Sequence, residues 1–224
     1  FVVSIPAPEA LREVIVTDRH LLVQASGGAG CCLGAFDGAV RWHLAAPAGG
    51  RIGPQADGET AVGVGADGVV TRWEPLVGRS TAVGTLPARV GAIRRVTVAP
   101  DGRWAFVQGV ALEPDFHLIY GDYDRSVDAA WLWDFSRAAV AWEDRESRYE
   151  AVPPRFTADS LGLLLPPGLR QPPGWVDVAS GQVRHTLACS RWLNDMRIDS
   201  QCGFALHRLP HERALACTPL DAGS

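Results

Sequence analysis

The sequence predicts an all-β fold made of about five similar units, each with four short antiparallel strands. A two-part pattern of turns and apolar runs recurs five times, and the runs are short and bounded by Gly, Pro, Asp or Ser. Asp-Gly pairs separate several of these runs, which is a strong hairpin signal because tight primed turns need a positive φ. Helical repeats would instead place apolar residues three and four apart over ten or more residues.

The first part of the pattern is a polar turn followed by an apolar run, and we expect it to join the first two strands of each unit. Its aspartates are separated by 39, 44, 58 and 40 residues, and they are Asp18, Asp57, Asp101, Asp159 and Asp199. A period of about 40 to 45 residues is that of a four-stranded blade. The sequence therefore predicts a β-propeller of about five four-stranded antiparallel blades, which closes alone or with further blades.

The second part is another turn followed by a strand, and we expect it to join the third and fourth strands of each unit. It occurs at Phe36–Trp42, Ala66–Trp73, Phe135–Trp142, Ala179–His185 and Pro210–Ala216. The residues that end the first four copies, Trp42, Trp73, Trp142 and His185, thus occupy equivalent positions. Equivalent positions in repeats favour packing between blades over a ligand cage, because aromatic side chains bury a large area.

Within a single domain of residues 1–224, the expected repeats span approximately 11–45, 50–77, 90–143, 154–188 and 192–218. We also expect residues 2–5 to form a lone strand before the first repeat. In the third repeat the second strand ends near Gln108 and the third begins near Ala129, which leaves a surplus at Gly109–Asp128. Four prolines between 166 and 173 make the corresponding connection of the fourth repeat a stiff loop.

Two segments resemble known propeller repeats. VTVAPDGRWAFVQG, from Val96 to Gly109, resembles the first hairpin of WD40-like repeats, and FDGAVRWHL, from Phe36 to Leu44, resembles a repeat of the pyrroloquinoline-quinone type. The resemblance covers nearly the whole chain and implies a β-propeller. The Gly-His pair and the Trp-Asp end of WD40 repeats are absent, apart from an out-of-register Trp133-Asp134, so no cofactor residues carry over and we expect no cofactor.

Composition argues against nucleic acid and membranes as partners. The net charge is −4 and the densest cationic cluster is only Arg89, Arg94 and Arg95, whereas a nucleic-acid binder carries a basic stripe. All 21 cations are arginine, which is typical of a GC-rich bacterial coding sequence. No signal peptide and no apolar run of 18 residues are visible, and the five cysteines favour buried thiols in a reducing compartment. We expect a cytoplasmic protein.

No catalytic signature is present: the chain has no G-x-S-x-G, no H-E-x-x-H and no phosphate loop with lysine. Asp122, Asp124 and Asp128 are spaced as in a calcium loop only in part, since the mid-loop glycine and closing glutamate of an EF-hand are missing. The metal-ligating residue types near the C-terminus match no common zinc spacing; they are Cys202, His207, His211 and Cys217. We expect no metal.

These observations favour a non-catalytic protein–protein interaction scaffold in a bacterial multi-protein assembly. The alternative is a propeller enzyme or small-ligand binder that uses the central channel. The expected partner-binding residues lie in the surplus of the third repeat and are Asp115, Phe116, His117, Tyr120, Asp122, Tyr123 and Asp124. Aromatic side chains among acids suit a protein partner with a basic surface. Alternatively, His117–Tyr120 forms an extra hairpin that covers a blade edge.

Overall fold

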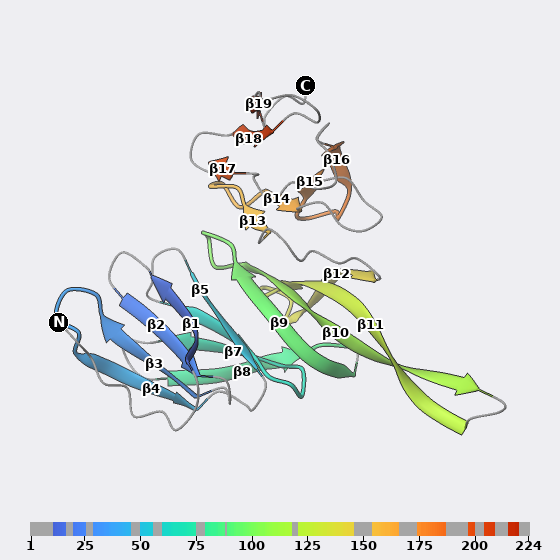
Figure 1. Cartoon of the computed structure of the whole chain (residues 1–224), viewed down its shortest axis with the longest axis horizontal. Coiled ribbons are helices and arrows are strands. Elements are labelled where there is room, and N and C mark those ends of the chain that lie inside the picture. Colours follow the sequence, from blue (N-terminus) through green and yellow to red (C-terminus); the bar gives the residue numbers. More distant parts are fainter. Residues whose placement is uncertain are drawn as a thin grey trace.

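In the computed structural model of the protein, every regular element among the described residues is a β-strand, which confirms the all-β prediction for this part of the chain (Figure 1). The structure describes residues 11–16, 20–25, 29–45, 50–55, 60–74, 79–87, 89–117, 121–145, 154–165, 174–186, 197–199, 204–208 and 215–219. The strand predicted at residues 2–5 lies outside these ranges.

The strands form five antiparallel sheets, and within each sheet their order in space is their order in the chain. The first sheet comprises β1 (Leu11–Val16), β2 (His20–Ala25), β3 (Ala29–Gly34) and β4 (Val40–Ala45). The second comprises β5 (Arg51–Pro54), β6 (Ala61–Val64), β7 (Val69–Glu74) and β8 (Arg79–Thr85). The third comprises β9 (Val90–Val98), β10 (Trp104–His117), β11 (Gly121–Asp134) and β12 (Ala139–Arg145). The fourth comprises β13 (Arg155–Phe156), β14 (Gly162–Leu165), β15 (Gly174–Asp177) and β16 (Val183–Thr186), and the fifth comprises β17 (Arg197–Asp199), β18 (Phe204–Arg208) and β19 (Leu215–Pro219).

Two of the recurring aspartates, Asp101 and Asp159, close their turns with their own side chains. Asp101 accepts the backbone N–H of Arg103 at 2.9 Å, and Asp159 accepts that of Leu161 at 2.9 Å. The residue that follows each of these aspartates has a positive φ, 67° at Gly102 and 63° at Ser160. An aspartate that holds the backbone two residues further on, next to a residue in the left-handed region, is what the repeated sequence motif specifies.

The second repeat departs from the expected pattern of turns. The turn at Asp67-Gly68 joins β6 to β7, the second and third strands, and not the third and fourth. Only ten residues separate Asp57 from Asp67, against 19 between Asp18 and Asp37 in the first repeat, so a single strand fits between the two turns. The fourth strand, β8, therefore lies after residue 77, where this repeat was expected to end.

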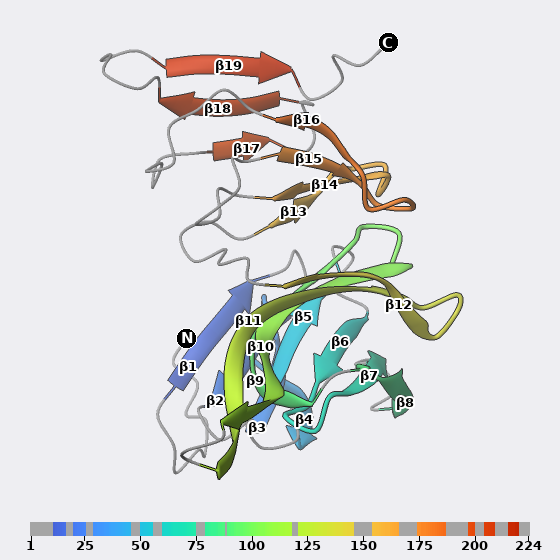
Figure 2. The same ribbon diagram turned by 90° about the vertical axis from the view of Figure 1, so that its right-hand side faces the viewer.

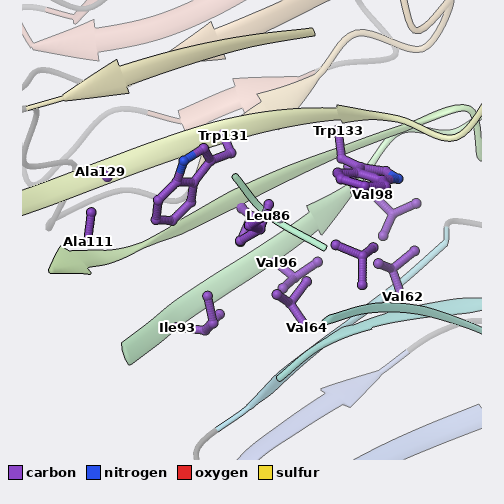
Figure 3. Close-up of a cluster of buried hydrophobic side chains, with 13 residues drawn as sticks. Val62, Val64, Leu86, Ile93, Val96, Val98, Ala111, Ala129, Trp131 and Trp133 are labelled. Carbon is purple, nitrogen blue, oxygen red and sulfur yellow. The ribbon is translucent and has the colours of Figure 1, made fainter. Parts of the chain in front are cut away.

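The third sheet packs between the second and the fourth, because side chains alternate along β10 and β11. Ala105, Val107, Trp131 and Trp133 join a buried cluster with residues of the second sheet, which Figure 3 shows. The residues between them on the same strands point to the fourth sheet, which lies above the third in Figure 2; they are Trp104, Phe106, Ala130 and Leu132. A strand has a side-chain period of two, so both faces of this sheet are buried.

The first strands of the second and third sheets lie side by side. A Cβ added at Gly53 of β5 would stand 2.5 Å from the carbonyl oxygen of Val96 in β9. Arg51 donates from Nε to the carbonyl of Arg94 at 2.9 Å, on the same pair of strands. Glycine at 53 is therefore required by a close approach of two backbones.

The turns after these first strands are also linked from sheet to sheet. Gln55 donates to the carbonyl of Pro100 at 3.1 Å, which joins the second sheet to the third. The backbone N–H of Asp101 donates to Oγ of Ser160 at 3.0 Å, which joins the third to the fourth. Residues that follow the first strands of three consecutive sheets are thus hydrogen-bonded in series, from Gln55 through Pro100 and Asp101 to Ser160.

The tryptophans at the ends of the second turns are not all equivalent. Trp142 lies on the fourth strand of its sheet and contacts the neighbouring sheet, since a Cβ at Gly181 would stand 2.9 Å from its Cδ1. Trp73 lies instead on the third strand, over Gly63 of its own sheet, so the prediction that it is equivalent to Trp142 is wrong. The side chains of Trp42 and His185 lie outside the described part of the structure.

Candidate partner-binding site

The surplus of the third repeat lengthens the central hairpin of the third sheet. β10 and β11 are each 14 residues long and pair without interruption from Trp104 with Asp134 to His117 with Gly121. The expectation that the second strand ends near Gln108 and the third begins near Ala129 is therefore wrong. The segment Val110–Asp128 belongs to a ribbon whose far end extends past β9 and β12 (Figure 1).

Three arginines from outside the ribbon hold its base through ion pairs. Arg89 contacts Asp124 at 2.8 Å and Arg94 contacts Asp128 at 2.7 Å. On the other side Arg145 of β12 pairs with Glu113 and with Glu143, the latter at 2.8 Å. The hydrogen bond and charge of Glu143, and then those of Glu113, raise the pKa of Arg145 above its ordinary value against the opposing effect of burial.

A backbone contact also fixes the base of the ribbon. The N–H of Leu112 donates to the carbonyl of Arg89 at 2.8 Å, just beyond the last pair of β9 with β10. Next to this contact, Ala111 of β10 pairs with Val127 of β11, and the two residues are only 1% and 5% exposed. Each ion pair contributes little alone, since exposed pairs are worth about 0–1 kcal/mol, but together they orient the ribbon.

The register shows which predicted site residues come together. Phe116 pairs with Asp122, and Asp115 pairs with Tyr123, so two of the predicted aromatic residues, Phe116 and Tyr123, lie opposite an acid. The side chains of these four residues and of His117, and the whole of Tyr120, lie outside the described part of the structure. Their role in binding stays a prediction.

Asp124 has an internal contact that the sequence did not indicate. The structure places it against Arg89, with 37% of its side chain exposed. In the sequence, Arg89 and Arg94 appeared only as a modest cationic cluster. The signal that could have indicated their ion pairs was the acidic segment 15 to 40 residues further along the chain. The ribbon is thus both acidic and anchored by cations of its own chain.

Strand β11 ends at a fully buried carboxylate, Asp134. It accepts the hydroxyl of Ser136 at 2.6 Å and the backbone N–H of the same residue at 2.8 Å, and Arg103 lies 3.3 Å away. Burial opposes ionisation, but these hydrogen bonds outweigh it and lower the pKa of Asp134 below its ordinary value. Every partner of this carboxylate belongs to its own sheet, which marks it as part of the fold.

Neither set of residues weighed for metal binding is assembled in the described part of the chain. Asp124 and Asp128 each pair with an arginine, and no group of three or more His, Cys, Asp or Glu side chains gathers among the residues with described side chains. The side chains of the C-terminal set, Cys202, His207, His211 and Cys217, lie outside that part. Cys31 and Cys32 are buried thiols, and burial raises the pKa of Cys31.

No protein-family model matches the chain, and no curated protein matches its sequence. Among the elements that the structure describes, no helix is long and apolar enough to cross a membrane.

Proposed function

We propose that the protein is a β-propeller, or a part of one, that serves as a non-catalytic platform for protein–protein recognition in a bacterial multi-protein assembly. The ribbon formed by the ends of β10 and β11 is its partner-binding site. The observation that carries the proposal is the uninterrupted pairing of two 14-residue strands whose far end lies beyond the rest of their sheet. An insertion at one unit of a regular array commonly marks a binding face.

Three features support the propeller architecture. Four of the five described sheets are four-stranded antiparallel meanders and the fifth has three described strands, and the third sheet buries both faces against its neighbours in the chain. The first strands β5 and β9 approach each other closely at Gly53 and Val96, as strands near a common axis do. The first turns of three successive sheets are joined by the side chains of Gln55 and Ser160. Small-angle X-ray scattering tests this architecture: a compact chain of this length has a radius of gyration of about 17 Å.

The composition of the ribbon supports a protein partner. Phe116, Tyr120 and Tyr123 offer large contact areas at a low cost in side-chain entropy, which is the property of residues that dominate binding energy. Asp115 and Asp122 lie beyond the last described arginine contact, that of Arg89 with Asp124, and steer a basic surface towards the ribbon.

A shortened ribbon tests this function. Glu113 and Arg125 are opposite each other, so replacing residues 114–124 by Asn-Gly closes the hairpin with a tight two-residue turn. The ion pairs of Arg94 with Asp128 and of Arg145 with Glu113 are kept, and only the exposed pair of Arg89 with Asp124, worth about 0–1 kcal/mol, is lost. We expect the shortened chain to keep its melting temperature and to lose a partner that the full chain retains from extracts of its native host. A triple variant F116A/Y120A/Y123A should lose the same partner. Retention of that partner by both variants would contradict the proposal.

A further inference from the structure

The two outer edges of the ribbon differ in what they offer to another chain. The N–H of Leu112 points away from β11, because it donates to the carbonyl of Arg89. Successive backbone N–H groups alternate in direction along a strand, so residue 114 also faces this outer edge. Residue 114 is a proline and has no N–H. The outer edge of β10 is therefore interrupted at the first position beyond its contact with β9.

The outer edge of β11 has no such interruption. Since Leu112 faces outward, Glu113 faces inward and exchanges hydrogen bonds with its opposite residue Arg125. The even-numbered residues of β11 consequently direct their N–H and C=O groups to the outer edge. Pairing of β11 with β12 ends at Ala129, and no described strand pairs with the outer edge from Asp122 to Ser126. This stretch contains no proline.

We propose that the ribbon binds its partner by strand addition: an extended, cationic segment of another protein pairs antiparallel or parallel with the outer edge of β11 at Asp122, Asp124 and Ser126. This inference rests on the proposed function and specifies how the same site works. An exposed strand edge is a template for another strand, and main-chain hydrogen bonds then supply affinity while side chains supply specificity.

Charge determines the occupant. Asp122 and Asp124 occupy alternate positions of the open edge, so lysine or arginine at alternate positions of an added strand meets their carboxylates. A second copy of this chain is a poor occupant, because it would bring the same acidic segments together and the whole chain carries a net charge of −4. The occupant is thus a basic segment of a different protein.

The probe for this inference is a blocked octapeptide of alternating lysine and valine, added to the isotopically labelled full chain. Its control has the same sequence with every backbone nitrogen methylated, which keeps the charge and prevents strand pairing through either edge of the peptide. Amide hydrogen exchange is read by nuclear magnetic resonance. At a free peptide concentration ten times its Kd, we expect exchange at Asp122, Asp124 and Ser126 to slow about tenfold. Exchange at Tyr123 and Arg125 should stay unchanged, because these amides already face β10.

A pair of variants at Ser126 makes the test specific. Ser126→Pro removes one outward N–H at a position of the same kind as Pro114, whereas Ser126→Ala leaves the backbone unchanged. Proline should abolish the slowing at Asp122 and Asp124, and alanine should preserve it. The methylated peptide should slow no amide in the full chain, which keeps the test valid even if the proline variant does not fold.

Three results would overturn strand addition: equal binding of the methylated peptide, slowing that does not alternate along β11, or slow exchange of the outward amides in the free chain. The test is separable from that of the proposed function. If F116A/Y120A/Y123A loses the host partner while Ser126→Pro keeps it, the ribbon binds a partner but not by strand addition. If none of these variants loses the partner, both proposals fail.

Discussion

The indole ring of Trp133 lies against Gly84 across the interface between the third and second sheets. A Cβ built at Gly84 would stand 2.6 Å from Cη2 of the ring, a distance that real contacts do not reach. Trp133 is 1% exposed and belongs to the cluster that joins the two sheets (Figure 3). β8 and β11 therefore pack at this distance only because residue 84 has no side chain.

Gly84→Ala should lower the free energy of unfolding by about 1–3 kcal/mol, because an added methyl group in a well-packed interface displaces a buried ring. Urea unfolding followed by tryptophan fluorescence measures the change. Thr81→Ala, at an exposed position of the same strand, is the control and should change stability by less than about 0.5 kcal/mol. Equal midpoints for the two variants would show that the interface is looser than the structure indicates.

Two substitutions at Ser160 should separate backbone strain from hydrogen bonding. Ser160 has a φ of 63° and accepts the N–H of Asp101 from the neighbouring sheet. Ser160→Ala loses the hydrogen bond and keeps the strained φ, so it should destabilise by about 1–3 kcal/mol. Ser160→Gly loses the same bond but relieves the strain, so its loss should be smaller. A greater loss for glycine, in thermal unfolding of the two variants, contradicts this account.

The turns between the last two strands of the third and fourth sheets provide a matched pair. Ala138 is exposed with a φ of 51°, and Gly181 in the corresponding turn has a φ of 70°. Ala138→Gly should keep or raise the melting temperature. Glycine removes about 1–2 kcal/mol of backbone strain from the folded state, and the extra conformational entropy that it gives the unfolded chain costs less than that. Gly181→Ala should lower it, since its Cβ would also stand 2.9 Å from Trp142. A fall for Ala138→Gly would show that the alanine is not strained.

Stability should fall steeply in acid. Burial opposes ionisation of Asp134, but hydrogen bonds from Ser136 outweigh this effect and lower its pKa. Hydrogen bonds from the hydroxyl groups of Thr157 and Ser180 likewise lower the pKa values of Asp159 and Asp177. A lowered folded-state pKa stabilises the fold above the unfolded pKa of about 3.9, and this contribution is lost as the pH falls through the folded value. Urea midpoints measured from about pH 6 downward should therefore decline below about pH 4.

Asp134→Asn isolates the contribution of the fully buried carboxylate. It should destabilise the protein at neutral pH by about 1–3 kcal/mol, since Ser136 and Arg103 lose an ionised acceptor. The urea midpoint of this variant should also fall less steeply below about pH 4, because asparagine has no proton to bind there. An acid decline identical to that of the unchanged protein would place the titrating groups elsewhere.

The hairpin turns could be predicted from the sequence because they depend on a few adjacent residues. Asp101-Gly102 and Asp159-Ser160 combine a side chain that holds the backbone with a residue in the left-handed region, and both form turns where the pattern indicates. The alternation of apolar residues along β10 likewise depends only on the period of a strand. Local chemistry of this kind is independent of what the rest of the chain does.

Which strands a turn joins is not set by the chemistry of the turn itself. Asp67-Gly68 has the same local chemistry as Asp37-Gly38, yet it joins β6 to β7, because only one strand fits between it and the preceding turn. The length of β10 and β11 was also not readable locally. Polar and charged residues at Glu113, Asp124 and Asp128 looked like a loop, but arginines distant in the sequence neutralise them and allow strand pairing to continue.

The sequence by itself thus determined where the chain turns and that it forms strands, since φ preferences and side-chain period act within a few residues. The tertiary structure decided which face each strand presents to which sheet, as with Trp131 towards the second sheet and Leu132 towards the fourth. It also decided how far the ribbon extends from the third sheet. Those outcomes depend on ion pairs and packing between residues far apart in the chain, which no local pattern contains.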